Sequence, residues 1–561
     1  KRLSSKVTKA FFSISGISSA EAYTSYFSGS STYCPALSVI FSPDGVKLSF
    51  AASICSPPVW RIIIPVHTAI NASAAGTEIT IINAFFHGNF PAFLFLLFSI
   101  PFLYINNAHL VENYLVYGYN CYMQKYKIIT YGCQMNLHES EKAAGILRSL
   151  GYEECDREED ADIILFNTCC IRDNAERRAK GNIGAAKVFK RNNPDLIIAV
   201  MGCMTQQDSA GEAMAKKFPF VDIILGTNNL DKLAECVEKV RNSRKRSVLI
   251  DPCATPEIRE DTPVFRTSGT NAWLNIMYGC NNFCTYCIVP YVRGRERSRT
   301  PENVMNEFNR LIDEGYKEIT LLGQNVNSYG KDLGMTNGFA LLLEKIAAVR
   351  GDFRVRFMTS HPKDFNADIA DVIASSKNIC NNIHLPVQSG SDKILKLMNR
   401  HYTRDYYMSL IQMIRSKMPD CGITSDIMVG FPYEEDEDFA DTLDLVNKVR
   451  YSGAFTFVYS PRKGTPAADM SQVSPEVSKR RIIELVNTQN KIVKEISKTF
   501  EGKVLRVLCE DLAPKGEGKV CGRSECGRMV TFDGDKHSIG NFYDVKIVKS
   551  QSASLFGEVV E

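Results

Sequence analysis

The feature that most constrains the fold is a repeated alternation of short apolar runs with longer helical patterns. Runs typical of β-strands recur between residues 126 and 459, and segments with the 3.6-residue period of an amphipathic helix separate most of them. Strands that alternate with helices in this way pair in parallel, because each helix carries the chain back to the starting edge of the sheet. The sequence therefore predicts an α/β protein built on parallel sheets.

The alternation falls into two blocks, and the first covers residues 123–242. Its expected strands lie at 126–131, 161–166, 196–201 and 221–225, and its expected helices at 138–150, 175–189 and 230–240. This order predicts an amino-terminal α/β domain with a parallel sheet. Residues 243–270 follow, and their charge, Pro and Thr content indicates a linker.

The second block covers residues 271–497 and contains six strand-and-helix units. Strands are expected at 272–277, 318–322, 354–358, 382–386, 423–429 and 454–459, and helices between them at 302–311, 340–349, 367–374, 406–417 and 435–449. A complete eight-unit barrel would need two more units. The block therefore predicts a partial, open (β/α)6 barrel with its chemistry at the carboxyl ends of the strands.

Three cysteines crowd the loop after the first strand of this barrel. Cys280, Cys284 and Cys287 have the spacing C-x3-C-x2-C. Thiolates are the usual ligands of iron–sulfur clusters, and three of them on a four-iron cluster leave one iron open to another ligand. A structural zinc site is the alternative, but it normally includes a second Cys or His pair, which the neighbouring sequence lacks. The spacing favours a [4Fe–4S] cluster.

In the first block, each of the first three strands ends at a cysteine. These residues are Cys133, Cys169 with its neighbour Cys170, and Cys203. Taken singly, each is more typical of a small buried apolar residue. Ligands of open parallel sheets gather at the carboxyl ends of the strands, however, so together they predict a second three-cysteine centre. The spacing does not decide between Cys169 and Cys170.

The C-x3-C-x2-C triplet resembles that of the radical S-adenosylmethionine (SAM) enzymes. The resemblance implies that SAM binds the open iron of a [4Fe–4S] cluster and is cleaved to a 5′-deoxyadenosyl radical, so that the cofactor carries the chemistry. The runs Thr-Tyr-Gly-Cys-Gln-Met-Asn (130–136), Asn-Thr-Cys (167–169) and Met-Gly-Cys (201–203) resemble the methylthiotransferases, radical SAM enzymes with an auxiliary four-iron cluster. In that family the middle ligand directly follows Asn-Thr. The resemblance thus implies an auxiliary [4Fe–4S] cluster on Cys133, Cys169 and Cys203.

Polar residues follow the barrel strands where SAM is expected. Gly323 and Gln324 follow the second strand, and Gln388 and Ser389 follow the fourth. Each run is also an ordinary turn sequence for backbone reasons. Their recurrence at one rim favours SAM contact for some of them. In the run 430–434, this chain has Tyr433 where the family commonly has Gly, which leaves the local turn undefined.

Four arginines follow the triplet at alternate positions: Arg293, Arg295, Arg297 and Arg299. Guanidinium groups match phosphate and carboxylate oxygens, so the RNA backbone and the SAM carboxylate are candidate partners, with a solvated edge as the alternative.

The tail, residues 498–561, follows a charged amphipathic helix at 476–498. It contains five short strands separated by Gly, Asp and Ser, at 504–509, 518–521, 529–532, 542–548 and 555–560. This pattern predicts a small β-barrel of the oligonucleotide-binding (OB) type. The tail resembles the TRAM domain, an RNA-binding module.

Three further runs, at 321–330, 384–391 and 398–403, resemble the branch of the methylthiotransferases that acts on isopentenyl-adenosine in tRNA. The implied reaction is methylthiolation of carbon 2 of N6-dimethylallyladenosine at position 37, with one SAM as methyl donor and a second as radical source. A pocket between the two clusters and the terminal barrel is expected to accept the base, because single-stranded loops allow a base to be splayed out.

Two alternatives stay open. One is the same chemistry on threonylcarbamoyl-adenosine tRNA or on a ribosomal-protein aspartate, and the more distant one is a non-catalytic Fe–S sensor that binds RNA. The implied partners are the anticodon loop of tRNA and an electron donor such as a flavodoxin or ferredoxin, and the chain is expected to be a monomer.

Residues 1–122 differ from the rest of the chain. They contain none of its sixteen Met residues and only ten charged ones, and Met123 directly precedes the first well-patterned segment. We therefore expect translation to begin at Met123, with residues 1–122 as upstream sequence or a disordered extension. Peptides from before Met123 in the native product would contradict this. The apolar run 91–104 holds two prolines and is too short to cross a membrane.

Composition limits the remaining possibilities. The net charge of +3 is small, so any contact with RNA is expected to be local. Eighteen cysteines without a regular pairing pattern favour a reducing compartment, and hence the cytoplasm.

Overall fold

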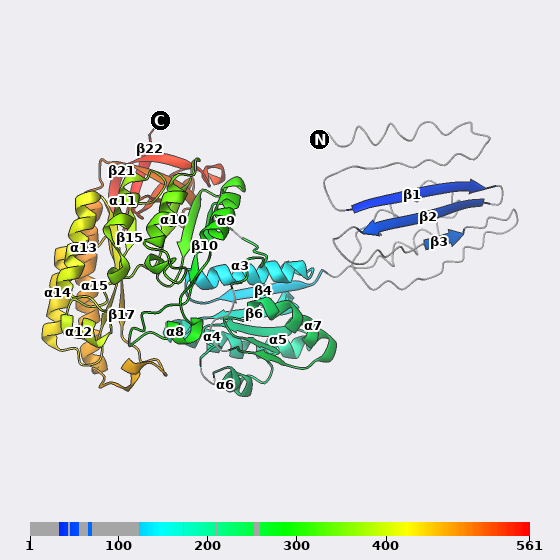
Figure 1. Ribbon diagram of the computed structural model, residues 1–561, viewed down its shortest axis with the longest axis horizontal. Coiled ribbons are helices and arrows are strands. Elements are labelled where there is room, and N and C mark those ends of the chain that lie inside the picture. Colours follow the sequence, from blue (N-terminus) through cyan, green and yellow to red (C-terminus); the bar gives the residue numbers. More distant parts are fainter. Residues whose placement is uncertain are drawn as a thin grey trace. The chain divides into compact units, whose positions relative to one another are not determined.

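The computed structural model describes residues 123–560, except 172, 208–209, 252–257 and 267, together with three earlier strands (Figure 1). The chain divides into two compact units, residues 1–119 and 120–561. In the first unit, β1 (Tyr33–Ser42), β2 (Gly45–Ile54) and β3 (Val66–Ala69) form an antiparallel sheet. The rest of 1–122, including the run 91–104, lies outside the described residues, so the expectations for it stay predictions.

The second unit begins with a six-stranded parallel sheet in the order β5-β4-β6-β7-β8-β9. Every residue of the central strands β6 and β7 is buried, which explains why both read as unbroken apolar runs. The strands are β4 (Lys125–Thr130), β5 (Glu153–Glu154), β6 (Ile163–Thr168), β7 (Ile197–Gly202), β8 (Ile223–Leu225) and β9 (Ser247–Leu249). Because β9 pairs with β8, the sheet extends into the range expected as a linker.

Helices cover both faces of this sheet. One apolar cluster contains residues of α3 (Gln134–Ser149) and α7 (Leu233–Ser243), and another contains residues of α4 (Asp173–Ala185) and α6 (Ala210–Lys217). The helix expected at 175–189 is divided at Ala186, where α5 (Lys187–Asn192) begins. The sequence analysis missed α6, because this short helix buries only Gly211 and Met214 and so has little apolar periodicity.

The second domain contains the six predicted parallel strands. They are β10 (Asn271–Asn275), β13 (Glu318–Leu322), β14 (Arg354–Phe357), β15 (Asn382–His384), β16 (Gly422–Val429) and β17 (Gly453–Val458). They pair as β10-β13-β14 and β15-β16-β17, and a single bridge between Val355 and Ile379 links the two groups. Among the described strands, β10 and β17 do not pair with each other. The prediction of a partial, open barrel is confirmed.

The barrel helices pack around the strands in one apolar core. The five predicted helices are α9 (Pro301–Asp313), α10 (Gly338–Ala347), α11 (Ala367–Ser375), α13 (Arg404–Lys417) and α14 (Asp436–Val449). Two short helices were not predicted, α8 (Val289–Arg293) and α12 (Asp392–Leu397). A small antiparallel pair, β11 (Met277–Tyr278) with β12 (Arg297–Ser298), flanks the cysteine triplet.

The tail forms a closed barrel in the order β18-β19-β20-β22-β21, which confirms the predicted small β-barrel. It follows α15 (Pro475–Lys498) and consists of β18 (Val504–Leu512), β19 (Lys519–Ser524), β20 (Met529–Asp533), β21 (Phe542–Gln551) and β22 (Ser554–Val559). Across the described ranges, α15 included, we find no helix with the length and apolar character that a membrane crossing requires.

The terminal barrel docks at the amino ends of the central barrel strands. Arg354 opens β14, donates a 2.6 Å hydrogen bond to the carbonyl of Arg523 and pairs with Glu318, which opens β13. Arg356 donates a 2.6 Å hydrogen bond to the carbonyl of Ser524. Since the cysteine triplet follows the carboxyl end of β10, the terminal barrel lies at the other end of the strands (Figure 1). This corrects the expectation of a pocket between the clusters and the terminal barrel.

Candidate iron–sulfur and SAM site

The cysteine triplet lies in the loop after β10, where the barrel begins. Cys280 and Cys284 are buried and Cys287 is half-buried. Burial raises the pKa of Cys280 to about 12 and that of Cys287 still further above its ordinary value, and the nearby thiol of Cys284 adds to both shifts. Thiols in such surroundings ionise readily only beside a cation, which fits the binding of a metal group.

The backbone on the amino-terminal side of the triplet is held close to the chain that follows α8. Gly279 has φ +75°, and a Cβ at this position would lie 2.0 Å from the carbonyl oxygen of Arg295, so only glycine fits there. The amide of Cys280 donates a 3.1 Å hydrogen bond to the carbonyl of Gly294. The loop is therefore fixed before any ligand binds.

Arg400 holds the other side of the triplet, and the sequence analysis missed it. Its guanidinium is buried, with Nη1 3.5 Å from Cys284 Sγ and Nη2 2.7 Å from the carbonyl of Pro386. Nε donates to the hydroxyl of Tyr402 at 3.1 Å. Arg400 lies 116 positions after Cys284, and no spacing rule connects the two residues. Its only signal was its place in the run 398–403.

Several buried polar atoms gather where β13 and β14 end, and they have no hydrogen-bond partner in the part of the chain that the structure describes. Buried polar groups in folded proteins are nearly always paired, so an unpaired group of them indicates a missing ligand. The set includes acceptors and donors, which fits the amino, carboxylate and hydroxyl groups of SAM. The atoms are Gln324 Oε1, Asn325 Oδ1, Asn327 Nδ2, Ser360 Oγ and His361 Nε2.

His361 contributes a hydrogen-bond donor to this group. Burial lowers the pKa of His361 far below its ordinary value, and the nearby charge of Arg400 acts in the same direction, so the ring is neutral. Its Nδ1 accepts a hydrogen bond from the amide of Lys363 at 3.3 Å. The proton therefore resides on the unpartnered Nε2.

The structure divides the four residues predicted to contact SAM. Gln324 belongs to the group with unpartnered atoms. Gly323 precedes it, and a Cβ built on Gly323 would lie 2.6 Å from Met277 Cγ. Gln388 is buried with φ +72° and exchanges backbone hydrogen bonds with β16. Ser389 is fully buried, with its hydroxyl 3.3 Å from that of Thr442 on α14, which argues against a SAM contact.

The structure places Cys133, Cys169 and Cys203 just beyond the carboxyl ends of β4, β6 and β7. The parallel register of β6 with both neighbours sets these three ends side by side. A Cβ built on Gly132 would lie 2.8 Å from Cys169 Sγ, so the Cys169 thiol lies against the backbone that precedes Cys133.

Cys170 lies at the same edge. A hydrogen bond from Cys170 lowers the pKa of the Cys203 thiol to about 7, and the charge of Arg293 acts in the same direction, while burial opposes both. Both candidates for the middle position, Cys169 and Cys170, are therefore near the other two cysteines. Within the described ranges, no three His, Cys, Asp or Glu side chains are arranged to hold a metal ion. A four-iron cluster spreads its thiolates over separate irons, so they need not converge on one point.

The segment after the cysteine triplet packs into the apolar core of the amino-terminal domain. Ile288 and Val292, in the segment directly after Cys287, belong to the same buried cluster as Cys169, Cys170 and Cys203. The loop after β17 makes a second connection, where Arg462 pairs with Glu176 at 3.2 Å and donates to the carbonyl of Ile171 at 3.0 Å. The barrel rim and the edge of the amino-terminal sheet are thus packed against each other.

The four arginines after the triplet do not share a face, because α8 ends at Arg293 and the chain turns at Gly294. Arg293 and Arg299 are buried in ion pairs, at 2.7 Å from Glu139 and 2.7 Å from Glu307 respectively. Neither can reach an RNA backbone from there, which corrects the expectation for these two residues.

The other two arginines differ from this pair. Arg295 is exposed and stacks over the ring of Phe283, with its guanidinium carbon 4.3 Å from the ring centroid. Arg297 is half-buried and donates to the carbonyl of Arg293 at 3.3 Å. Of the four, Arg295 is the one whose exposure fits an RNA contact.

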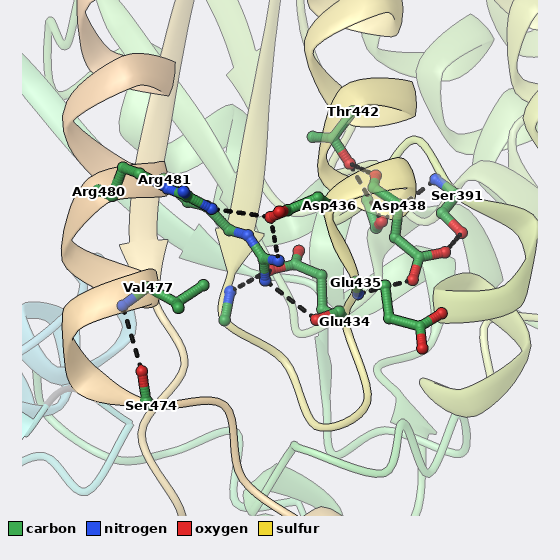
Figure 2. Close-up of polar contacts among 12 residues, drawn as sticks. Ser391, Glu434, Glu435, Asp436, Asp438, Thr442, Ser474, Val477, Arg480 and Arg481 are labelled. Atoms are coloured by element: carbon green, nitrogen blue, oxygen red, sulfur yellow. Dashed lines mark hydrogen bonds and ion pairs between the residues drawn. The ribbon is translucent and has the colours of Figure 1, made fainter.

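The turn at 430–434 is defined by a buried ion pair. Tyr433 adopts φ +62°, the left-handed conformation that suits the family's Gly, and its ring is exposed. Glu434 is buried and accepts hydrogen bonds from the amide of Gly430 at 2.6 Å and from Arg481 at 2.9 Å (Figure 2). The turn is therefore fixed although residue 433 is not Gly.

Replacing Arg481 with Met is expected to lower the free energy of unfolding by about 3 to 5 kcal/mol, because it leaves a buried carboxylate unpaired. Arg480→Met is the control, since Arg480 contacts Asp436 at the surface, where an ion pair contributes little to stability. Burial raises the pKa of Glu434, so this carboxyl holds its proton more tightly in the folded state. The loss should therefore be smaller at about pH 5 than at about pH 8. Equal urea midpoints for the two variants would contradict the buried-pair argument.

Comparison with known proteins agrees with this geometry. Residues 274–446 match the radical SAM superfamily, residues 125–226 match uncharacterized protein family UPF0004, and residues 498–560 match the TRAM domain.

Several curated relatives match across all three of these regions. The tRNA-2-methylthio-N(6)-dimethylallyladenosine synthase of Clostridium botulinum is 52% identical over 434 residues, which cover 77% of this chain and 96% of the relative. The enzymes of the same name from Pelotomaculum thermopropionicum and Carboxydothermus hydrogenoformans are 51% and 50% identical, over 78% of this chain and 97% and 99% of those relatives. The chain therefore belongs to the radical SAM family of tRNA-2-methylthio-N(6)-dimethylallyladenosine synthases.

Proposed function

We propose that this chain catalyses methylthiolation of carbon 2 of N6-dimethylallyladenosine at position 37 of tRNA, using SAM and two [4Fe–4S] clusters. The observation that carries the proposal is the core shared by Ile288 and Val292, which follow the triplet, with Cys169 and Cys203, because it packs the segment after the triplet against the sheet edge that carries the other cysteines. A radical generator and a sulfur source must lie close together to act on one carbon atom.

The residues of the barrel rim are assigned by their contacts. Cys280, Cys284 and Cys287 would hold the first cluster and leave one iron for SAM. The unpartnered atoms of Gln324, Asn327, Ser360 and His361 would bind the polar groups of SAM, and Arg400 would fix the cluster loop through Cys284. When bound, the first cluster and SAM supply the radical that removes hydrogen, and the auxiliary cluster supplies sulfur.

The auxiliary cluster is assigned to Cys133, Cys169 and Cys203. The family pattern favours Cys169 as the middle ligand, whereas Cys170 is buried in the same cluster as Cys169 and Cys203. After anaerobic reconstitution, the iron content of the Cys169→Ala variant is expected to be about four per chain, compared with about eight for the unaltered chain. That of the Cys170→Ala variant is expected to stay near eight. An iron assay on both variants measures this. The reverse pattern would assign the middle ligand to Cys170.

The substrate and partners follow from the same assignment. Exposed Arg295 beside the cluster loop and the terminal TRAM barrel would contact the tRNA backbone at two separated places. The first cluster needs an electron donor, for which a flavodoxin or ferredoxin is proposed, and the working form is proposed to be a monomer. A tRNA substrate supports a cytoplasmic location.

The test compares three tRNA substrates under reducing conditions with SAM. Dimethylallyl-adenosine tRNA is expected to gain the methylthio group, while unprenylated tRNA and threonylcarbamoyl-adenosine tRNA remain unmodified. Mass spectrometry of digested nucleosides reads out each product. If only the threonylcarbamoyl-adenosine tRNA is modified, dimethylallyl-adenosine tRNA is not the substrate and the proposal is rejected. Absence of 5′-deoxyadenosine with every substrate would favour a non-catalytic sensor.

A further inference from the structure

The side chain of Arg293 extends from the barrel segment into the amino-terminal domain. It ends beside α3, near the strand ends that carry Cys133, Cys169 and Cys203. Its side chain is almost fully buried. Nη1 pairs with Glu139 Oε1 at 2.7 Å, and Nη2 donates to Asn136 Oδ1 at 2.9 Å. Both partners lie on α3, the helix that follows Cys133. Neither the radical chemistry nor SAM binding accounts for this residue.

Asn136 connects Arg293 to the backbone that carries the cysteines. Its amide nitrogen donates to the carbonyl of Tyr131 at 2.8 Å and to that of Thr168 at 3.0 Å. Tyr131 lies two residues before Cys133, and Thr168 directly precedes Cys169. A single amide therefore ties two of the three strand ends together, and Arg293 fixes its orientation.

Arg293 also acts on the thiols by its charge. Its Nη2 contacts Asn136, which is bonded to the strand ends that lead to Cys133 and Cys169, whereas its Nη1 contacts Glu139. A guanidinium remains charged when buried, so the positive end of the pair lies on the side of the strand ends that carry the thiols. In a low-dielectric interior such an oriented pair has a strong local effect.

Stability alone does not explain this arrangement. A buried ion pair is often no better than apolar residues of the same volume, because both charges lose their hydration. Around metal sites, by contrast, the groups behind the ligands set ligand orientation, charge and reduction potential. The Arg293–Glu139 pair, with its guanidinium on the side of the strand ends that lead to Cys133 and Cys169, is the kind of arrangement expected for that role.

We propose that Arg293 is a positioning residue that sets the charge, and through it the reduction potential, of the cluster held by Cys133, Cys169 and Cys203. The proposal rests on the proposed function, because that cluster is part of it. The relevant step is one-electron reduction of [4Fe–4S]2+ to [4Fe–4S]+, with the electron supplied by a donor of the flavodoxin or ferredoxin class, which is oxidised by one electron. A nearby positive charge stabilises the more negative product and raises the potential. The unpaired carboxylate of Glu139 would do the opposite.

The test uses the full chain with Cys280, Cys284 and Cys287 replaced by alanine, so that only the auxiliary cluster is reconstituted. This triple variant, called the background chain, is compared with three further variants made in it: Arg293→Gln, Glu139→Gln and the double variant with both changes. Anaerobic titration with dithionite and mediators, followed by electron paramagnetic resonance, gives each midpoint potential. The expected order is Glu139→Gln highest, then the background chain, then the double variant, and Arg293→Gln lowest. Arg293→Lys, which keeps the charge, should shift less than Arg293→Gln.

The outcomes separate this inference from the proposed function. About four irons per background chain are expected. If it binds none, the assignment of the auxiliary cluster is rejected, and the inference is rejected with it. If it binds about four and all variants share one potential, only the inference is overturned. If Arg293→Gln loses its iron but the double variant keeps it, the charge role is supported. If Arg293→Gln and the double variant lose iron equally while their circular dichroism stays native, Arg293 has only a structural role and the inference is overturned.

Discussion

Replacing Cys280, Cys284 and Cys287 together with alanine is expected to abolish both 5′-deoxyadenosine formation and methylthiolation. In the proposed function these thiols hold the cluster that binds and cleaves SAM, so without them no radical should form and no hydrogen should leave the substrate. Iron should fall from about eight to about four per chain, since the other cysteine set is untouched. Liquid chromatography with mass spectrometry measures 5′-deoxyadenosine after dithionite reduction, and an iron assay runs in parallel.

The matched control is Cys380→Ala. This thiol is also buried in the barrel domain, but it lies beside Arg356 at the end where the terminal barrel docks. We expect it to retain iron, SAM cleavage and product. If the triple variant still released 5′-deoxyadenosine above the level of an enzyme-free control, the triplet would not hold the reducing cluster.

The position of each cysteine was predictable because parallel strands align their carboxyl ends. Once the apolar runs before Cys133, Cys169 and Cys203 are recognised as neighbouring strands, their thiols must meet at one edge. The six barrel strands were also readable, since most of them are short apolar runs separated by helical patterns. Local sequence patterns determine these features, so the sequence was sufficient.

The contacts between elements were not predictable in this way. Arg400 reaches Cys284 across 116 positions, and the run that contains it looks like an ordinary polar turn. Arg293 and Arg299 sit in a basic run that reads as a solvated or RNA-binding edge, yet both are buried because acidic partners arrive from other segments. A charge pattern along one segment does not show which carboxylates the fold will place beside it.

The docking of the terminal barrel is a further case. Arg354 and Arg356 alternate with apolar residues in β14, which is typical of a strand with one polar face. Their hydrogen bonds to backbone carbonyls of β19 place the TRAM barrel at the amino ends of the barrel strands. In the proposed function, a tRNA that contacts both this barrel and the clusters must therefore extend along the central barrel.

Replacing Cys133, Cys169 and Cys203 together with alanine is expected to separate the two halves of the reaction. The triplet and the unpartnered polar groups proposed to bind SAM lie on the barrel rim and are not changed by these substitutions, so 5′-deoxyadenosine should still form. No sulfur source remains beside the substrate, so the methylthio product should fall to the background level. The same chromatographic assay measures both, with prenylated tRNA as substrate.

The outcome that contradicts this assignment is formation of methylthiolated tRNA by the variant. Ile288 and Val292, which follow the triplet, pack in the same core as Cys169 and Cys203. If the variant also loses 5′-deoxyadenosine, the iron content shows whether the substitutions have disturbed the triplet through this core. About four irons per chain show that the triplet cluster is still held. Cys236→Ala is the control for the amino-terminal domain, since this buried thiol lies on α7 with Ser247 as its hydrogen-bond partner and belongs to the core that contains α3. It should keep both products, so that loss of sulfur transfer in the triple variant traces to the sheet edge and not to any lost thiol.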